Sequence, residues 1–579
     1  SEAYSLVVGF HVDRESLKTR STAEVIVRPL LAMNGVPVSI KSLTDVKLTI
    51  ESLDLDGVST MQEVPNIELF EDREKTHEFL VPQRLSKLTF SLDGRVVNSS
   101  AGGPPTNLRA TQSFSMNEID RTEKVEDLHF VRSGESYGIE MRGKNGEKRP
   151  SRPVSASLKS RDFRHPFSVT LKTDLQGRID FGTLFNIEAI TVTGPEGTSH
   201  TWPMLTDQAT YQKLVHGRVG QSIRIPFIGM LTDRTGLAPE EKPSRAEVSF
   251  LELRGENYAA DQFDALSIQE GFLVIDGLSA GDYELFMKVP KARMRVRVTL
   301  GKEQGRYFLG KHRQLERRLL EPPGIESITV QKKVKIQVSK IGENPDATDK
   351  PKKNRRNKKA DENDEKIAEE VVVQLRAISP YTRVHLVATR MVPEYDMFAT
   401  LSRVRSSEPW LFSQNANASV YVTGRNIGDE YAYIFQRRYG KKFPGNMLER
   451  PALLLNPWVV EETHSSKQTA QQGNEFGAAA AMPTSMADAS MAQPATVEGP
   501  PANFANLDFL TSGSIVLANS EPSEDGTIRI PLESLAQHQH LTVVVVDPLS
   551  TFSRSFALPA RELALDDLCL KKGLDPQQH

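Results

Sequence analysis

The chain has 579 residues, of which 38% are hydrophobic, and its 72 basic and 75 acidic side chains leave a net charge of −3. One hydrophobic core seldom organises more than about 250–300 residues, so a single domain is excluded and about four are expected. The balanced charge gives no indication of binding to nucleic acid. No apolar stretch approaches the ~20 residues of a membrane-spanning helix, so no membrane insertion is expected.

The first 116 residues contain short runs in which hydrophobic and polar residues alternate, a pattern typical of half-buried strands. The turn signals Asn34-Gly35 and Asp93-Gly94 separate some of these runs. The runs are 4–12, 23–31, 46–53, 77–81, 88–92 and 108–114. They predict an antiparallel β-sandwich over residues 1–116.

A short pattern recurs further along the chain: a glycine, then apolar residues at alternate positions, then another strand-like run. It begins at Gly177, Gly271 and Gly526. We interpret the copies as related modules, and chance similarity among β-proteins is the alternative. The predicted units are sandwiches over 117–206, 207–300 and 301–464, and a last β unit over 502–579 that continues into a longer protein.

Two segments have compositions that cannot form a packed core. Residues 342–369 are strongly polar, and residues 465–501 are rich in Ala, Gln, Ser, Met and Pro. Both are predicted to be disordered. Basic residues gather at 350–359, but acidic residues follow directly. We therefore expect a solvated loop there, with no nucleic-acid partner.

One helix is predicted, over residues 429–439. Asp429 and Glu430 lie in its first turn, where acidic side chains favour the helix dipole. Arg437 and Arg438 lie in its last turn, and Gly440 ends it. The predicted fold class is mainly β, with serial antiparallel β-sandwich modules of Ig-like or macroglobulin-like type and one short helical insertion.

The sequence contains no catalytic or metal-binding constellation that we can identify. Cys569 is the only cysteine, which excludes internal disulfides and multi-cysteine metal sites. His538 and His540 could form half of a zinc site, but we expect exposed histidines at a turn. No acid and base pair stands out among the many carboxylates. We expect no enzyme activity, no cofactor and no bound metal.

The segment 408–461 combines Trp, Tyr and Arg, the residue types that dominate recognition surfaces. The alternative is that these side chains form the core of a helix-on-sheet subdomain. The candidate binding residues are Trp410, Arg425, Asn426, Tyr431, Arg437, Arg438, Arg450 and Trp458. They predict contact with a protein or a cell-surface partner. The compartment stays open, with the periplasm or cell surface preferred over the cytoplasm.

Serial sandwiches of about 100 residues without disulfides, with a low-complexity tract between β segments, resemble the macroglobulin-type domains of the alpha-2-macroglobulin family. The family's thioester motif, Cys-Gly-Glu-Gln, is absent, because Leu570 and Lys571 follow Cys569. The tract 465–501 resembles a protease bait region only in its expected exposure. The resemblance implies an alternative function, a protease trap without a thioester.

Three strings are similar to those of large, uncharacterised multi-β-domain proteins of planctomycete-type bacteria. They are Asn426-Ile-Gly-Asp-Glu-Tyr431, Met447-Leu-Glu-Arg-Pro451 and Leu453-Leu-Leu-Asn-Pro-Trp458. This resemblance implies that the chain is the amino-terminal part of a longer polypeptide. The function predicted first is a non-catalytic structural or adhesive interaction segment of a large multidomain protein.

Overall fold

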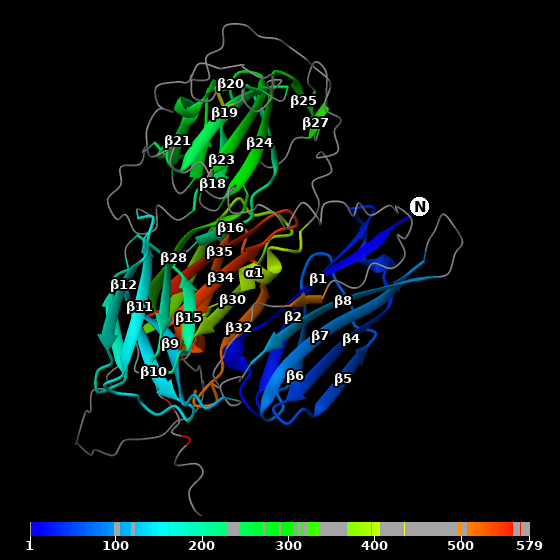
Figure 1. Ribbon diagram of the computed structural model, residues 1–579. Coiled ribbons are helices and arrows are strands. Elements are labelled where there is room, and N and C mark those ends of the chain that lie inside the picture. Colours follow the sequence, from blue (N-terminus) through cyan, green and yellow to red (C-terminus); the bar gives the residue numbers. More distant parts are fainter. Residues whose placement is uncertain are drawn as a thin grey trace, which may run out of the picture.

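A computed structural model describes most of the β-rich part of the chain. The described residues are 2–97, 105–116, 122–160, 163–184, 186–204, 207–228, 242–255, 257–269, 272–288, 291–305, 307–309, 314–316, 322–334, 367–394, 397–405, 433–434, 496–498, 507–535, 537–559, 565 and 568. They form four β-sandwich modules. Module 4 lies in the middle, modules 1 and 2 flank it, and module 3 lies beyond one end (Figure 1).

Module 1 comprises the described residues of 2–116 and packs two sheets around one core. One sheet has the order β1-β2-β3 with β6 beside β2, and the other has the order β31-β8-β7-β4-β5. The elements are β1 (Tyr4–Val12), η1 (Arg14–Ser16), β2 (Thr22–Met33), β3 (Val36–Pro37), η2 (Ile40–Ser42), β4 (Thr44–Asp54), β5 (Ser59–Pro65), β6 (Lys75–Leu80), β7 (Leu85–Val96), β8 (Thr106–Ser115) and β31 (Thr496–Glu498).

The two turn signals of module 1 have different outcomes. Asn34 and Gly35 both have positive φ and join β2 to β3, as predicted. Asp93 and Gly94 lie instead inside β7, so the prediction of a turn there is wrong. A Cβ on Gly94 would lie 2.6 Å from Leu43 Cγ. The glycine therefore lets a core leucine pack directly on the strand backbone.

Module 2 comprises the described residues of 122–204, in two sheets of order β13-β10-β9 and β12-β11-β14-β15. Trp202 stacks on Phe130 in its core, with ring centroids 5.1 Å apart. Its strands are β9 (Glu126–Ser133), β10 (Ser136–Gly143), β11 (Pro153–Ser160), β12 (Phe167–Lys172), β13 (Arg178–Gly182), β14 (Ile187–Thr193) and β15 (Ser199–Pro203).

Module 3 comprises the described residues of 214–299, in sheets of order β17-β24-β23-β19-β20 and β18-β22-β21. Its elements are β17 (Leu214–Arg218), β18 (Ile223–Pro226), β19 (Val248–Arg254), β20 (Asn257–Asp261), η4 (Phe263–Ala265), β21 (Leu266–Gln269), β22 (Phe272–Ile275), β23 (Gly281–Met287) and β24 (Ala292–Thr299). A small separate sheet follows, with β25 (Lys302–Gln304), β26 (Tyr307–Leu309) and β27 (Gln314–Glu316).

Module 4 is assembled from distant parts of the chain, in sheets of order β28-β29-β33 and β16-β35-β34-β30-β32. The sequence placed residues 502–579 in a separate unit, but their strands pair with β29 and β30. The elements are β16 (Asp207–Ala209), β28 (Gly324–Val334), β29 (Ile367–Arg376), β30 (Arg383–Thr389), β32 (Ile515–Ser520), β33 (Thr527–Pro531), η7 (Leu532–Leu535), β34 (His540–Val546) and β35 (Thr551–Ala557).

The fold class predicted from the sequence is confirmed: the chain is mostly β, and its described strand pairs are antiparallel except β17 with β24 and β31 with β8. The described α-helix is α1 (Met397–Leu401), which was not predicted. Of the predicted helix 429–439, only Tyr433 and Ile434 are described, and both are helical. The predicted disordered segments lie outside the described residues, except that β29 includes 367–369 and β31 includes 496–498.

The strands that follow the three repeated glycines, β13, β22 and β33, lie in three different modules. Strands β13 and β33 lie at the edges of their sheets, whereas β22 is the central strand of its sheet. Gly177 and Gly526 do share one role. Each has a φ near +76°, and each carbonyl accepts a hydrogen bond from the neighbouring strand, from Met141 N–H and Leu375 N–H, at 2.8 Å.

Replacing Gly526 with alanine is expected to destabilise module 4 by about 2–4 kcal/mol. The new Cβ would lie 2.6 Å from the Leu375 carbonyl oxygen, and the φ of +77° disfavours any side chain. Gly57→Ala is the matched control, since its φ is +84° but nothing lies within 4 Å. Urea unfolding should show about 1 kcal/mol of loss for the control. Equal losses for the two variants would contradict the steric role of Gly526.

Candidate functional site

Strands β30 and β34 of module 4 are buried on both faces, because module 1 and α1 pack against the outer face of their sheet. Every residue of β30 and β34 is buried. Leu541, Val543 and Val545 face the core of module 4. Val544 and Val546 face outward and pack against Ile26 of module 1 and against α1. Successive side chains of a strand point to opposite faces, so each strand serves two contacts at once.

Glu74 of module 1 is the centre of a buried ionic contact with module 4. Its carboxylate, fully buried, accepts two hydrogen bonds from Arg383, from Nε at 2.6 Å and Nη2 at 2.7 Å, and one from His385 Nε2 at 3.0 Å. His385 Nδ1 accepts from the Asn519 N–H at 3.3 Å, so the ring proton lies on Nε2. Burial acts to raise the pKa of Glu74, but His385 and Arg383 hold it well below its usual range.

Arg28 of β2 extends the same contact. Its Nε lies 3.7 Å from Glu74 Oε1, and its Nη1 donates to the Leu401 carbonyl at 3.0 Å. The guanidinium also donates to the Asp547 carbonyl, at 3.4 Å. Burial lowers the pKa of Arg28 to about 10, against the attraction of Glu74. Arg28 therefore joins module 1 to both α1 and the turn after β34.

A second contact joins η1 of module 1 to the residues that follow β30. Glu15 accepts from the Met391 N–H at 2.8 Å and from the Arg390 N–H at 2.9 Å. The Arg390 side chain is fully buried, and its Nη2 donates to Thr511 Oγ1 at 2.6 Å and to Gln537 Oε1 at 2.9 Å. Burial raises the pKa of Glu15 to about 8, and the neighbouring Asp13 adds to the effect.

A third contact joins module 2 to the same segment. His200 lies between two carboxylates, with Nε2 2.6 Å from Asp127 Oδ1 and Nδ1 2.5 Å from Glu394 Oε1. Burial would lower the pKa of His200, but the two carboxylates raise it to about 9. Nearby, the Val392 N–H donates to the Phe130 carbonyl at 2.8 Å.

Residues 390–394 thus form a junction segment that contacts modules 1, 2 and 4 within five positions. Both ring nitrogens of His200 are engaged by carboxylates, so the imidazole has no free nitrogen to act as a general base. Arg390 and Glu15 are likewise directed at protein partners. The buried ion pairs and hydrogen bonds of this site fix the modules relative to one another.

The buried histidines differ from the sequence expectation. His538 and His540 are 1% and 4% exposed, so the prediction of exposed histidines is wrong. Both ring nitrogens of His538 lie 2.9 Å from carbonyl oxygens, those of Leu535 and Gly513. Within the described residues, no group of His, Cys, Asp or Glu side chains is arranged to hold a metal ion. No described helix is long and apolar enough to cross a membrane.

The binding residues predicted from the sequence lie outside the described residues, so the prediction stays untested. They are Trp410, Arg425, Asn426, Tyr431, Arg437, Arg438, Arg450 and Trp458. In the same segment Tyr433 is described and is 8% exposed. Cys569 and all but Thr496–Glu498 of the bait-like tract 465–501 also lie outside the described residues. The junction residues were missed because single charged residues carry no sequence signal for partners hundreds of positions away.

Two comparisons with known proteins give matches, one over module 1 and one over the whole chain. A family model described as the AbpF third immunoglobulin-like domain matches residues 13–122, which include β2 to β8. The chain is also 26% identical over 615 residues to Actin-binding protein F of Dictyostelium discoideum. That alignment covers 100% of this chain and 24% of the relative. The chain therefore spans about a quarter of the length of the relative it matches.

Solved structures of bacterial alpha-2-macroglobulins are similar at a lower level. The Escherichia coli protein activated by porcine elastase has 10% identity and a TM-score of 0.26, covering 96% of this chain and 44% of that chain. The Salmonella protein reacted with methylamine has 11% identity and a TM-score of 0.16, covering 96% and 33%. At these TM-scores the likeness has no bearing on function.

The resemblance to planctomycete-type proteins gains no support. The named curated relative comes from Dictyostelium discoideum. Module 1 matches an immunoglobulin-like domain family, and the chain as a whole is similar to an actin-binding protein.

Proposed function

We propose that this chain is a non-catalytic segment of an actin-binding protein, in which linked β-sandwich modules contact the actin filament. The observation that carries the proposal is the similarity to Actin-binding protein F, because it extends over every module. The immunoglobulin-like match of residues 13–122 supports the same assignment from module 1 alone. Modules of this class commonly present binding surfaces on a rigid sandwich.

The junction supports a mechanical role within such a protein. Glu74 with Arg383, Glu15 with the Arg390 and Met391 amides, and His200 with Glu394 each link different modules through buried polar groups. Breaking a buried ion pair by removing one partner costs about 3–5 kcal/mol, so the modules resist independent motion. A segment held in this way keeps its binding surfaces at a fixed spacing along a partner.

Co-sedimentation with filamentous actin tests the proposal. The chain, at fixed concentration, is expected to pellet with increasing actin and to reach saturation with a micromolar Kd, equivalent to about −7 to −8 kcal/mol. Polymerised tubulin is the control, because it is another filament and separates specific binding from trapping. Pelleting that does not depend on actin concentration, or that is equal with tubulin, would contradict the proposal.

A further inference from the structure

Strand β12 forms an exposed edge of module 2. It pairs with β11 on one side, and no described strand pairs with its other side. An unprotected edge presents unpaired backbone N–H and C=O groups, and proteins usually shield such edges or use them for binding. Strand addition by a partner segment is one established use, in which main-chain hydrogen bonds supply affinity.

Two phenylalanines flank the start of this edge and are mostly exposed. Phe163 is 69% exposed and Phe167 is 67% exposed. Phe167 lies opposite Leu158 and on the same face as Val169 and Leu171, which pack against the core. The strand therefore extends beyond the end of the core and presents Phe167 at its rim. Aromatic side chains are enriched in protein interfaces relative to other surfaces.

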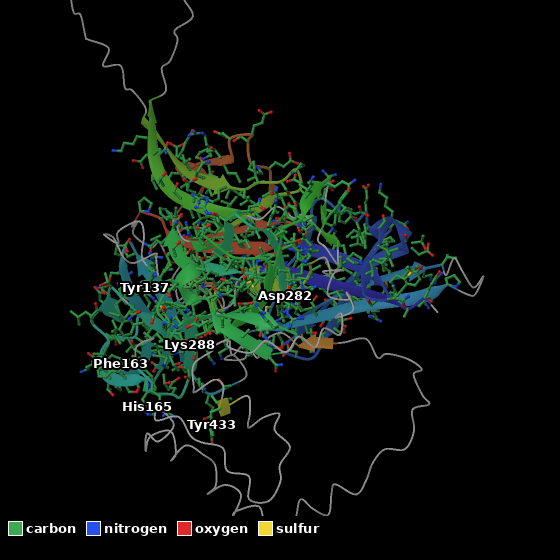
Figure 2. The ribbon with its side chains drawn as sticks, turned by 90° about the horizontal axis from the view of Figure 1, so that it is seen from above. Tyr137, Phe163, His165, Asp282, Lys288 and Tyr433 are labelled. Atoms are coloured by element: carbon green, nitrogen blue, oxygen red, sulfur yellow. The ribbon has the colours of Figure 1, made fainter. Side chains whose placement is uncertain are left out.

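A lysine of β11 binds the backbone at Phe163. Lys159 Nζ donates to the Ser160 carbonyl at 2.8 Å and to the Phe163 carbonyl at 2.5 Å. Figure 2 shows Phe163 and His165 at the outer margin of module 2. An aromatic side chain whose own backbone is held by a hydrogen bond loses less conformational freedom on binding, which favours affinity.

The charge around this edge is opposite in sign to that of the whole chain. The segment 159–172 contains four basic residues and one acidic residue, a net charge of +3, whereas the chain as a whole carries −3. The described basic side chains at the edge include Arg164 and Lys172, both on exposed residues. A positive local field attracts acidic segments and repels basic ones.

We propose that the β12 edge, with Phe163 and Phe167, is a docking site for an acidic, extended segment of a partner protein. The proposal rests on the proposed function only for the identity of that partner, the actin filament. The segment would add to β12 as a further strand. Its acidic side chains would face the basic residues, and its apolar side chains would cover the two phenylalanines.

A model peptide tests the edge without actin. The fluorescein-labelled octapeptide of four Glu-Val repeats is expected to bind the full chain with a Kd on the order of 10–100 µM, measured by fluorescence anisotropy. Binding should weaken in 0.5 M salt, where charges are strongly screened. Amide hydrogen exchange of residues 167–172 should slow in the complex. No anisotropy change with up to ~200 µM wild-type chain would overturn the proposal.

Substitutions locate the binding. The double variant Phe163→Ser with Phe167→Ser is expected to bind the peptide at least tenfold more weakly. Leu175→Ser is the matched control, because Leu175 is 82% exposed in the turn at the other end of β12. Met61→Ser tests another edge strand, since Met61 is 63% exposed on β5. Both controls should bind within twofold of wild type, and equal binding by the double variant would overturn the proposal.

Actin co-sedimentation of the same variants separates the two proposals. Loss of pelleting by the Phe163 and Phe167 variant alone supports both. If the wild-type chain fails to pellet but binds the peptide through the phenylalanines, the docking edge stands and the actin function fails. If the chain pellets with actin, the double variant pellets equally and the peptide does not bind, the docking edge is overturned and the actin function stands.

Discussion

Replacing Glu74 with glutamine is expected to lower the free energy of unfolding shared by modules 1 and 4 by about 3–5 kcal/mol. The substitution keeps the side-chain shape but leaves Arg383 buried without a negative partner, and an uncompensated buried charge is costly. Urea unfolding followed by intrinsic fluorescence measures the loss. The same variant should show a larger radius of gyration in small-angle scattering, because module 1 is held less tightly to module 4.

Glu63→Gln is the control for this prediction. Glu63 forms an ion pair of 2.8 Å with Lys47, but both side chains are largely exposed, at 51% and 38%. Exposed pairs contribute about 0–1 kcal/mol, so this variant should be close to wild type in stability and dimensions. If Glu74→Gln were equally mild, the buried contact would not hold the modules together.

Acid is expected to destabilise the chain well before its carboxylates titrate. Burial lowers the pKa of His11, His129 and His540 to about 3, so these rings stay neutral in the folded state. In the unfolded chain they take up protons near pH 6.5. Below that pH the unfolded state binds more protons, and stability falls with slope of about 1.36 kcal/mol per pH unit for each ring.

Glu15 and His200 also affect how the free energy of unfolding depends on pH. Glu15 has a pKa raised to about 8 in the folded chain. Between pH 8 and 4.5 it is therefore protonated in the folded chain and ionised in the unfolded chain, so its contribution to the free energy of unfolding increases as the pH falls. His200, with a pKa raised to about 9, is charged in both states below pH 6.5 and contributes no change there. Its stabilisation is lost as the pH rises from 6.5 to 9. Between pH 6.5 and 5, the three histidines lower the free energy of unfolding by about 2 kcal/mol each, and Glu15 raises it by about 2 kcal/mol. The net loss of stability is about 4 kcal/mol.

The variant His11→Leu tests the acid prediction. Among the described residues, neither ring nitrogen of His11 has a hydrogen-bond partner, so the leucine also removes an unsatisfied polar group. The variant should lose about 2 kcal/mol less than wild type between pH 6.5 and 5, because one titrating ring is gone. Urea unfolding at the two pH values gives the comparison. Wild-type stability that is equal at pH 6.5 and 5 would rule out neutral buried histidines.

The fold class could be predicted because strand alternation and turn residues are local properties. Residues 4–12 were predicted as a strand and form β1 with the same limits. The run Leu541 to Val546 is almost continuously hydrophobic because β34 is buried on both faces, and the second face is covered only by the packing of module 1 on module 4.

The contacts of the junction could not be predicted, because their partners are distant in the chain. Glu15 and Arg390 lie 375 positions apart, and Glu74 and Arg383 lie 309 apart. A charged residue in a sequence is most often solvated, so each of these looked like an ordinary surface residue. The prediction of a turn at Asp93-Gly94 was wrong for a related reason. Gly94 makes room for the side chain of Leu43 against the strand and does not reverse the chain.

The pairing of β30 with β34 also has a consequence for synthesis on the ribosome. Strand β30 ends at Thr389, but its neighbour β34 begins only at His540. At about 5–20 residues per second, translation of the roughly 150 residues between them takes on the order of 10–30 s. During that interval an apolar strand that lacks its β34 neighbour is already outside the ribosome. Nascent chains should therefore depend on chaperone protection until the last strands emerge, and truncation before residue 540 should yield aggregates.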